Sequence, residues 1–462
     1  MRNSANGGKM VDVVVTGIGM ICALGADTST IWKSLLDGDS NKAPIPAHWR
    51  EYSDYQSQIW APLPEIDYTR WNFNRLEPMR SDQVSMIAAA CCHQALDQAG
   101  LNPVPKDSKG QRFSVDGTTA KRRGVFMGTG VGGINTSLDS HLYQATRHIN
   151  SQLKTHLDDL PNTKEREQLN STLERLKISR RFNPLAVTML MPNAVSAMPA
   201  IRFGFSGPCK TYTSACASGT VAIGEAFRAV KNGSIDMALC GGAEYLYDEY
   251  GSIFRSYDIT GALTKASSPD EYCGGFDESR SGFLFSQGGG AALIIESLDS
   301  AFSRGATPLA KITAFEETFD AHNMIAMDPT GRQIRDMLNT ALDSATLTAN
   351  DIDYINAHGT GTTQNDAIEA EIVQELFPPR PWINSSKSLM GHTIGASGAL
   401  EAAVTVLSIH NSQIHPCGNL TDPMPGLNLP LVRQKTEIRH AISQSFAFGG
   451  HNSCLLFEQI KN

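Results

Sequence analysis

The chain has 462 residues, of which 41% are hydrophobic and 19% are charged, a composition ordinary for a globular enzyme. Its formal net charge of −8 disfavours a nucleic-acid-binding protein, because duplex binding rests on a broad basic surface. The nine cysteines include no pair with metal-ligand spacing, and no apolar run is long enough to span a membrane. We therefore expect free thiols, no metal site and a cytoplasmic location.

The first part of the chain alternates between strand and helix patterns. Residues 1–10 are polar and are expected to form a disordered leader, and residues 11–19, VDVVVTGIG, predict a buried strand that ends in a turn. Residues 81–101 predict a helix with Ser81 as its N-cap and Gly100 as its stop. This alternation favours an α/β fold with helix-covered sheets.

A polar segment, about 139–179, interrupts this alternation. Leucines recur in it at helical spacing, and the Pro-Asn pair at 161–162 divides it into two parts, so we expect a helical hairpin on the surface. Its composition favours a solvated cap or a subunit contact over a substrate-specific lid.

Two glycine-rich turns, each followed by an apolar helix, recur far apart in the chain. ACASGTVAIGEAF, residues 215–227, precedes a buried strand at 235–244, and IGASGALEAAVTV, residues 394–406, repeats the same device. The similarity suggests two related halves, which we place at 11–296 and 297–462.

Cys216 stands where a strand near 210–214 leads into the helix predicted at 219–233. A helix start carries a partial positive charge and unpaired N–H groups, which favour a thiolate and can bind the oxyanion of an attacked thioester. By itself, however, an Ala-Cys-Ala sequence is more often a packed helix start. The cysteine alone leaves structural and catalytic roles open.

Two histidines lie on similar turns in the second half. NAHGTGTTQND, residues 356–366, places His358 after a predicted strand, and SSKSLMGH, residues 385–392, places His392 just before a helix. One such histidine would more often be structural. Two histidines and a cysteine, all on strand-to-helix turns, indicate a site, because α/β folds build their sites at the ends of parallel strands.

Four motifs, TSACASG, NAHGTGTTQND, SSKSLMGH and SFAFGGHN, together resemble the β-ketoacyl-acyl-carrier-protein synthases of the KAS I/II branch, in the thiolase superfamily. The resemblance extends over residues 11–460. It implies the five-layered αβαβα thiolase-like fold, an α/β fold of two pseudo-duplicated halves, and a homodimer. It also implies an enzyme that extends acyl chains by two carbons, through decarboxylative Claisen condensation with a malonyl-loaded carrier protein.

The resemblance gives a role to each matching residue. Cys216 corresponds to the nucleophile that holds the acyl chain as a thioester, and His358 and His392 correspond to the two active-site histidines. Lys387 matches the lysine of the family, and Glu369 matches its structural or proton-linked carboxylate partner.

Further matching residues bind the substrate or gate the site. Thr360 and Thr362 correspond to the threonines that hydrogen-bond the pantetheine arm of the carrier. Phe448 corresponds to the gating phenylalanine, whose N–H joins that of Cys216 in the oxyanion hole, and Phe446 belongs to the same loop. No cofactor of the enzyme is implied, because the carrier protein brings the pantetheine arm.

The expected partner is an acyl carrier protein loaded with acyl or malonyl groups. Carrier proteins are acidic, so an acidic enzyme needs a local basic patch to bind one, and Arg180 and Arg181 fall at the docking position of the family. A heterodimer with a ketosynthase-like subunit is the alternative to the homodimer. We expect neither nucleic acid nor a membrane as a partner.

Three departures from the family point to a specialised synthase, such as one that makes a polyene or another secondary product. The gate reads Phe-Ala-Phe where Phe-Gly-Phe is usual, so Ala447 is expected to restrict its movement. Ser286-Gln287 stands where relatives carry a glycine and an acidic residue, and the 139–179 segment is longer than in typical members.

Two other functions stay open at this stage. One is a non-catalytic subunit that shapes the tunnel of a heterodimer, which would explain the altered gate and the long segment, although Cys216, His358 and His392 argue against it. The other is a cysteine hydrolase, which would need a Cys-His pair with open access for water. The lysine-histidine motif and the gate phenylalanines do not suggest a hydrolase.

Overall fold

A computed structural model describes residues 11–106, 111–159, 161, 163–175, 182–377 and 381–460. The leader at 1–10 and the expected docking residues Arg180 and Arg181 lie outside this part of the chain.

Two groups of five strands build the main sheet. The first group is β1 (Val13–Ile21), β6 (Arg123–Gly128), β7 (Cys209–Tyr212), β8 (Met237–Tyr245) and β9 (Gly288–Ser297). The second group is β10 (Ala310–Phe319), β11 (Tyr354–Asn356), β12 (Trp382–Asn384), β15 (His440–Ala447) and β16 (His451–Glu458). In the described chain they form one sheet in the order β12-β11-β15-β16-β10-β1-β9-β8-β6-β7.

The two groups of strands have the same topology. In the first, β6 is parallel to β7 and β8, and β9 is antiparallel to β8 and β1. In the second, β11 is parallel to β12 and β15, and β16 is antiparallel to β15 and β10. The chain therefore contains two halves of one design, as its two similar turns suggest.

The halves join through β1 and β10, which pair antiparallel, and through two helices that pack against each other. These helices are α7 (Ser218–Lys231) and α13 (Ser397–Asn411), and α13 is buried along almost its whole length. They pack tightly near Gly219 and Gly398, where a Cβ added to Gly219 would lie 2.6 Å from the backbone nitrogen of Ala399. This contact brings the starts of both helices together.

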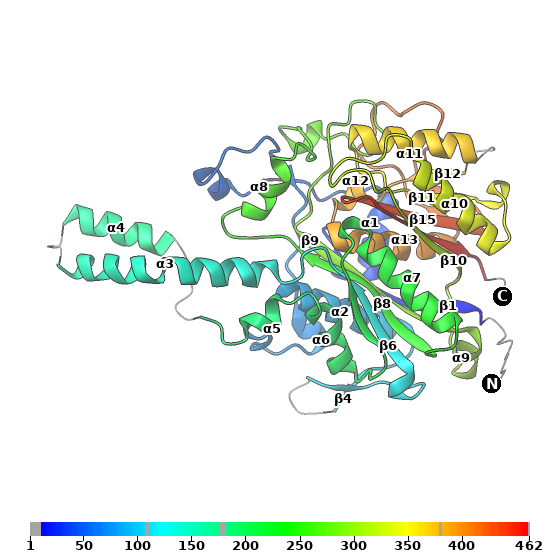
Figure 1. Ribbon diagram of the computed structural model, residues 1–462, viewed down its shortest axis with the longest axis horizontal. Coiled ribbons are helices and arrows are strands. Elements are labelled where there is room, and N and C mark those ends of the chain that lie inside the picture. The colour runs from blue at the N-terminus through cyan, green and yellow to red at the C-terminus, as the bar shows by residue number, and fades with distance from the viewer. Residues whose placement is uncertain are drawn as a thin grey trace.

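Helices on the two outer faces complete five layers. α2 (Gln83–Gln98) and α6 (Ala194–Phe203) pack on the first half, and α10 (Arg332–Ala345) and α11 (Thr363–Leu376) pack on the second. α7 and α13 form the middle layer, and the two halves of the ten-stranded sheet form the layers on either side of it. The order helix, sheet, helix, sheet, helix is the αβαβα arrangement that the resemblance implies (Figure 1).

The sequence prediction for the start of α2 is wrong by one residue. Asp82, not Ser81, is the N-cap, and its carboxylate accepts the N–H of Val84 at 3.2 Å. The same carboxylate also accepts the N–H and the hydroxyl of Thr136, at 3.2 and 2.6 Å. Asp82 therefore fixes two helix starts at once. Gly100, with a φ of 70°, ends the helix as predicted.

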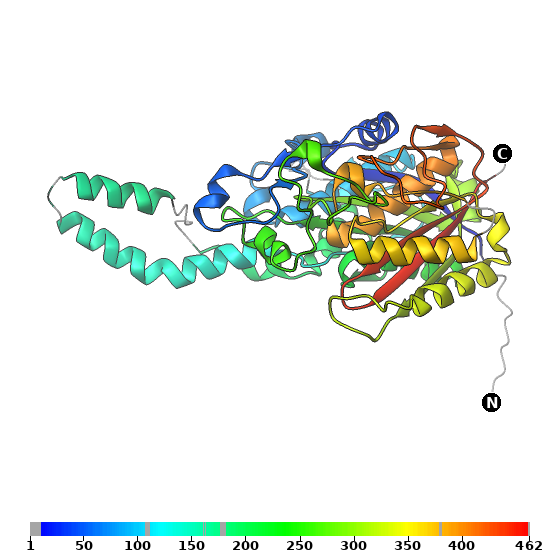
Figure 2. The same ribbon diagram turned by 90° about the horizontal axis from the view of Figure 1, so that it is seen from above.

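The predicted hairpin projects from the body of the molecule (Figures 1 and 2). Its helices are α3 (Ile134–Asp159) and α4 (Lys164–Arg175). α3 begins earlier than the sequence pattern indicates, because its first turn is anchored in the body through Thr136. Only the later turns of α3 leave the surface, so the root of the hairpin belongs to the core.

Shorter elements close the remaining surface. The helices are α1 (Thr28–Asp37), α5 (Ala186–Leu190), α8 (Ser252–Asp258), α9 (Leu298–Ser303) and α12 (Lys387–Met390). The strand pairs are β2 (Ala43–Pro44) with β3 (Ile59–Trp60), β4 (Val104–Pro105) with β5 (Phe113–Ser114), and β13 (Gln413–Ile414) with β14 (Gln434–Lys435).

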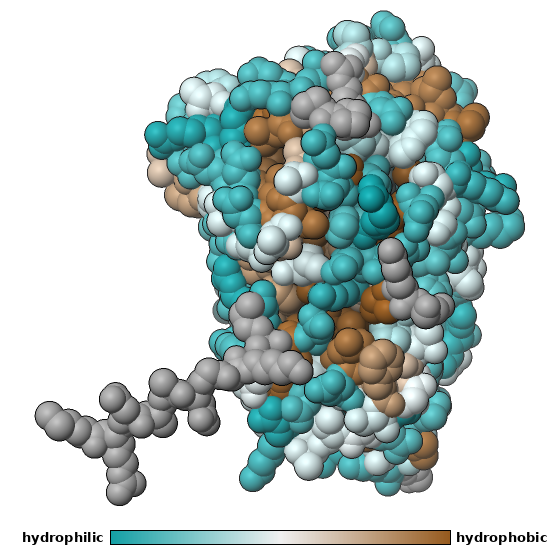
Figure 3. Space-filling model, turned by 90° about the vertical axis from the view of Figure 1, so that its right-hand side faces the viewer, coloured by the Kyte–Doolittle hydropathy of each residue, from teal (hydrophilic) through white to brown (hydrophobic). Residues whose placement is uncertain are grey.

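The surface turned away from the hairpin is mostly hydrophilic, with apolar side chains gathered in separate patches (Figure 3). Among the described helices, none combines the length and the apolar character that a membrane crossing requires.

Candidate active site

Cys216 lies on the turn between β7 and α7, in the short 3-10 segment Ala215–Ala217. Ala215 has a φ of 45°, a conformation that residues with a Cβ rarely adopt. The hydroxyl of Ser218 stabilises the turn, since it accepts the N–H of Ser214 at 2.8 Å and donates to the Ala215 carbonyl at 2.7 Å. The turn thus presents the cysteine two residues before Ser218, the first residue of α7.

Burial decides the protonation state of the Cys216 thiol. Desolvation raises its pKa to about 12, and the Lys387 charge and the backbone N–H groups of Phe448 and Cys216 lower it only in part. The helix start thus acts in the expected direction, but burial outweighs it, and the resting thiol is protonated at neutral pH. The two N–H groups nevertheless converge on the sulfur, which is the arrangement of an oxyanion hole.

His392 follows α12 and faces the cysteine. Its Nε2 lies 3.2 Å from the Sγ of Cys216. Its Nδ1 accepts the N–H of Ile394 at 3.3 Å and lies 2.8 Å from the Oγ of Ser397. Because a backbone N–H can only donate, Nδ1 is the acceptor of the neutral ring, and the ring proton sits on Nε2.

His358 follows the end of β11 and has the same tautomer. Its Nδ1 lies 3.2 Å from the Nζ of Lys387, which also donates to the His358 carbonyl at 2.7 Å. An ammonium group has donors only, so Nδ1 accepts and the ring proton is again on Nε2. The ring centroids of His358 and His392 are 5.7 Å apart, and the rings are inclined by 85°.

Both histidines are neutral. Burial lowers the pKa of His358 and of His392 well below the ordinary value, and the nearby Lys387 charge lowers it further. Neutral rings with a proton on Nε2 can donate hydrogen bonds to a developing oxyanion. The site therefore offers two such donors without a metal ion, and the described residues contain no cluster of three or more metal-ligating side chains.

The buried Lys387 forms its ion pair with Glu401 on α13, not with Glu369. The prediction of Glu369 as the lysine partner is wrong. Its carboxylate instead accepts the N–H groups of His358 and Gly359, at 2.7 and 2.8 Å, and so fixes the turn after β11. Sequence reasoning missed Glu401 because it lies within an apolar helix, and only the packing of α13 behind the site brings it to the lysine.

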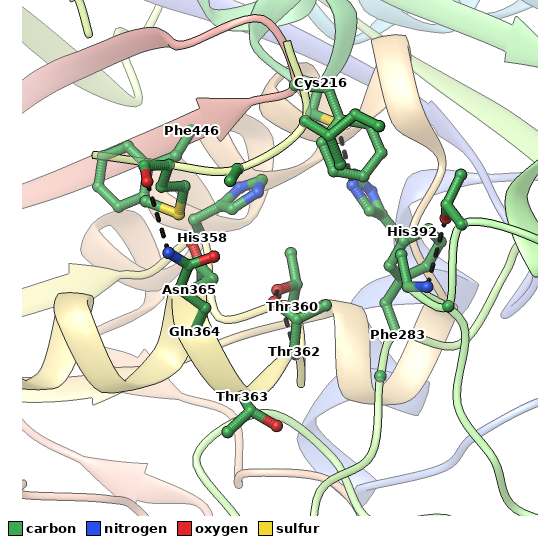
Figure 4. Close-up of a pocket in the computed structure, with 18 of the residues that line it drawn as sticks. Cys216, Phe283, His358, Thr360, Thr362, Thr363, Gln364, Asn365, His392 and Phe446 are labelled. Atoms are coloured by element: carbon green, nitrogen blue, oxygen red, sulfur yellow. Dashed lines mark hydrogen bonds between the residues drawn. The ribbon is translucent and has the colours of Figure 1, made fainter. Parts of the chain in front are cut away.

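A cavity of about 370 Å³ opens in front of the cysteine and the two histidines (Figure 4). Thr360 and Thr362 line it, and their hydroxyls are 2.9 Å apart. Phe446 and Phe448 line it as well, and the ring of Phe446 packs edge-on against His358, with 5.6 Å between centroids. The predicted catalytic, pantetheine and gate residues that the structure describes therefore gather here, with Lys387 and Glu369 directly behind them.

A second cavity, of about 300 Å³, shares Phe448 with the first. Val131, from the loop after β6, and Ile134 and Leu138, from the root of α3, form one side of it. Residues of α8, such as Ile253, form another side. This mostly apolar space beside the thiol cavity is suited to a hydrocarbon chain.

Two departures from the family, at Ala447 and Gln287, fit their surroundings without strain. Ala447 pairs with His451 in the ladder of β15 and β16, and the left-handed conformation begins only at Gly449, with a φ of 89°. An alanine therefore fits this backbone, and its effect on gate movement stays a prediction. Gln287 accepts the N–H of Leu63 at 3.0 Å and stabilises a loop.

A thiol, two imidazole donors and an oxyanion hole around one cavity equip the molecule for acyl transfer through a cysteine thioester, on a fold of the thiolase type. Two family models match the chain. The beta-ketoacyl synthase N-terminal domain matches residues 10–301, and the beta-ketoacyl synthase C-terminal domain matches residues 309–421. The chain belongs to the β-ketoacyl synthase family.

Known proteins resemble the chain over nearly its full length. The 3-oxoacyl-[acyl-carrier-protein] synthase 2 of Staphylococcus aureus (strain MRSA252) is 30% identical over 457 residues, which cover 98% of this chain and 99% of that protein. A β-ketoacyl synthase from Burkholderia phymatum STM815 superposes with a TM-score of 0.79 at 28% identity. The ishigamide ketosynthase/chain length factor superposes with a TM-score of 0.78 at 25% identity, and both structures cover 98% of this chain and match over 100% of their own length.

Proposed function

We propose that the protein is an elongating β-ketoacyl-acyl-carrier-protein synthase, which holds an acyl chain on Cys216 and extends it by two carbons from a malonyl-loaded carrier. One observation carries the proposal. The Nδ1 atoms of His358 and His392 both accept a hydrogen bond from a fixed donor, so two Nε2–H groups are available beside one thiol.

The first stage is acyl exchange. The Cys216 sulfur attacks the thioester of an acyl-loaded carrier, and the N–H groups of Cys216 and Phe448 hold the oxyanion of the tetrahedral intermediate. The carrier thiolate leaves and takes up the proton lost by the cysteine. The products are an acyl-Cys216 thioester and a free carrier thiol. Because the resting thiol is protonated, this stage depends on neighbouring groups that stabilise the thiolate as it forms.

The second stage is decarboxylation and condensation. A malonyl thioester loses carbon dioxide and becomes an enolate, whose oxyanion accepts the Nε2–H groups of His358 and His392. The enolate carbon then attacks the acyl-Cys216 thioester, and the cysteine thiolate leaves and takes up a proton from solvent water. One carbon–carbon bond forms, and the β-ketoacyl chain remains on the carrier.

The substrate arm needs contacts but no enzyme cofactor. We assign Thr360 and Thr362, on the wall of the cavity, to the pantetheine arm that the carrier brings, and Phe446 and Phe448 to the gate. The second cavity, next to Phe448, is assigned to the acyl chain.

We further propose a homodimer that uses the free edge of β7, the last strand of the sheet in the described chain. Unpaired N–H and C=O groups on such an edge are a template for pairing with a second copy. In this dimer each subunit is one whole chain, made of the two halves near 11–296 and 297–462. A cytoplasmic location is supported by the nine free cysteines.

The test is a single-turnover assay. The protein is incubated with a series of acyl-loaded carriers and then with malonyl-carrier, and the acyl-enzyme and the carbon dioxide are measured by intact mass and by gas release. We expect an adduct on Cys216 that is absent in Cys216→Ser, followed by a product longer by two carbons. A protein that forms no adduct and releases no carbon dioxide would instead be a non-catalytic subunit.

A further inference from the structure

Glu244, at the end of β8, is a fully buried carboxylate that belongs to none of the recognised motifs. It accepts four hydrogen bonds. The hydroxyl of Thr129 donates at 3.0 Å, and the backbone N–H groups of Gly130, Val131 and Gly395 donate at 2.5, 3.3 and 3.1 Å. Every partner is a donor, which is the environment that suits an ionised carboxylate.

The four donors come from two segments that meet at this carboxylate. Thr129, Gly130 and Val131 form the loop between β6 and α3, and Val131 lines the apolar cavity. Gly395 belongs to the turn that follows His392. The segments touch, because a Cβ added to Gly395 would lie 2.1 Å from the backbone nitrogen of Gly130. One side chain thus joins the wall of the apolar cavity to the turn of a catalytic histidine.

The turn after His392 needs support from outside. Ile394 has a φ of 50°, a conformation that is costly for a β-branched residue and persists only where the surroundings hold it. The N–H of Ile394 is the donor to Nδ1 of His392, and the next N–H, that of Gly395, is held by Glu244. The carboxylate therefore fixes the peptide adjacent to the one that sets the His392 tautomer.

A neutral side chain at this position would be less costly to bury. Burial raises the pKa of Glu244 to about 7, although its four donors act in the opposite direction. An ionised carboxylate in the core carries a desolvation penalty that a hydrocarbon or an amide avoids. An amide, however, has one acceptor oxygen and would turn its own N–H groups toward some of the donors.

We propose that Glu244 is a positioning residue for the condensation reaction. It holds the turn at 394–395 so that the Nε2–H of His392 stays directed at Cys216 and the cavity, and it ties this geometry to the loop that lines the apolar cavity. The kinetic consequence rests on the proposed function, whereas the effect on the histidine tautomer does not.

The variant Glu244→Gln tests the proposal, with Glu296→Gln as the matched control. Glu296 is equally buried and bonds to Thr16, Ser300 and Arg304, so its loss removes a comparable carboxylate from a place outside the two cavities. Two readouts are compared. They are the kcat and KM for carbon dioxide release from malonyl-carrier, and the ring ¹⁵N spectrum of histidine-labelled protein, with the His392 signals assigned by their loss in His392→Asn.

We expect Glu244→Gln to lower kcat by on the order of 100-fold with KM unchanged, because a small misplacement of a catalytic group has such an effect. Its His392 spectrum should lose the clear pattern of a protonated Nε2 and an unprotonated Nδ1, while Glu296→Gln keeps both the rate and the spectrum. If Glu244→Gln does not fold, Thr129→Val, which removes one donor, is measured in the same way and should show a smaller change of the same kind.

The proposal is overturned if Glu244→Gln, or Thr129→Val where Glu244→Gln does not fold, keeps the wild-type His392 spectrum, or if Glu296→Gln changes that spectrum equally. A wild-type protein that releases no carbon dioxide would refute the proposed function, and the ¹⁵N spectra would still decide the role of Glu244.

Discussion

At the scale of single residues, the site is governed by desolvation. Cys216, His358 and His392 are all buried, and burial raises the pKa of the thiol and lowers the pKa of both imidazoles. All three groups are therefore neutral at rest. The ion pair of Lys387 and Glu401 lies behind the histidines, and negative charge that develops in the reaction meets neutral donors that need no rearrangement.

The neutral histidines make stability depend on pH. The folded pKa of His358 lies well below the unfolded value near 6.5, so in acid the unfolded chain binds one more proton at this residue than the folded chain does. The folded state therefore loses stability relative to the unfolded state as the pH falls below 6.5. We expect the wild type to lose about 1.4 kcal/mol per pH unit more than His358→Gln below pH 6.5. Urea unfolding at pH 5, 6, 7 and 8 measures the difference.

Buried carboxyls act in the opposite direction over part of this range, so the comparison with the variant is essential. The pKa values of Glu244 and Glu369 are raised to about 7 by burial, which favours the folded state in acid and disfavours it as the pH rises from about 4.5 to 7. Wild type and His358→Gln share these carboxyls, which therefore cancel. Parallel pH curves for the two proteins would contradict a neutral His358.

At the scale of elements, one turn design occurs twice. Ala215 and Ile394 both have a positive φ, and each begins a 3-10 segment that leads into a central helix. In each turn a serine hydroxyl, that of Ser218 or Ser397, accepts the N–H of the residue four positions earlier. The first turn presents the nucleophile, and the second turn orients His392. The repeat in the sequence therefore corresponds to a repeated strand-to-helix turn, which positions a catalytic group in each half.

The start of α2 provides a prediction at the same scale. Asp82→Ala removes the acceptor for Val84 and for Thr136, so we expect a loss of roughly 1–2 kcal/mol or more in the free energy of unfolding. Ser81→Ala should change it by less than about 0.5 kcal/mol, as a surface substitution outside the cap does. Chemical denaturation of both variants decides between the two residues, and equal losses would refute the assignment of the cap.

At the scale of the whole molecule, the site exists because two halves meet. Cys216 precedes α7 of the first half, His392 precedes α13 of the second, and the close packing of these helices sets the distance between the two groups. Glycines permit this packing, because the atoms of the facing helix leave no room for a side chain at positions 219 and 398. The relation between the halves is therefore part of the catalytic geometry.

A substitution at the crossing tests this relation. Gly219→Ala would place a Cβ 2.6 Å from the backbone of Ala399, so we expect a loss of about 1–3 kcal/mol in stability together with slower acylation of Cys216. The control is Gly233→Ala, which has open space but a φ of 71° and should lose about 1 kcal/mol through backbone strain alone. The acylation rates of the two variants are compared at equal fractions of folded protein, which separates an effect on the site from a loss of stability. Normal acylation in Gly219→Ala would show that the crossing is not coupled to the site.

Local patterns in the sequence determined much of this protein. Apolar runs and glycine turns predicted the strands and helices of both halves, and the motifs around Cys216, His358 and His392 identified the family, because these features depend on neighbours close in the chain. The prediction of Ser81 as the N-cap of α2 is wrong because the cap is Asp82, whose carboxylate also accepts from Thr136, fifty-four residues away. The sequence predicts the effect of the helix start on the Cys216 thiol but not the burial that outweighs it, because burial depends on the packing of the whole chain.

Only the tertiary structure decided which groups support the reacting ones. The pairing of Lys387 with Glu401, and the contacts of Glu244 with Gly130 and Gly395, join residues from separate helices, strands and loops. No spacing in the sequence reveals such contacts, because a buried charge finds its partner wherever the packing of the core places one. The sequence determined the chemistry that the protein can perform, and the meeting of its two halves decided the protonation and direction of the groups that perform it.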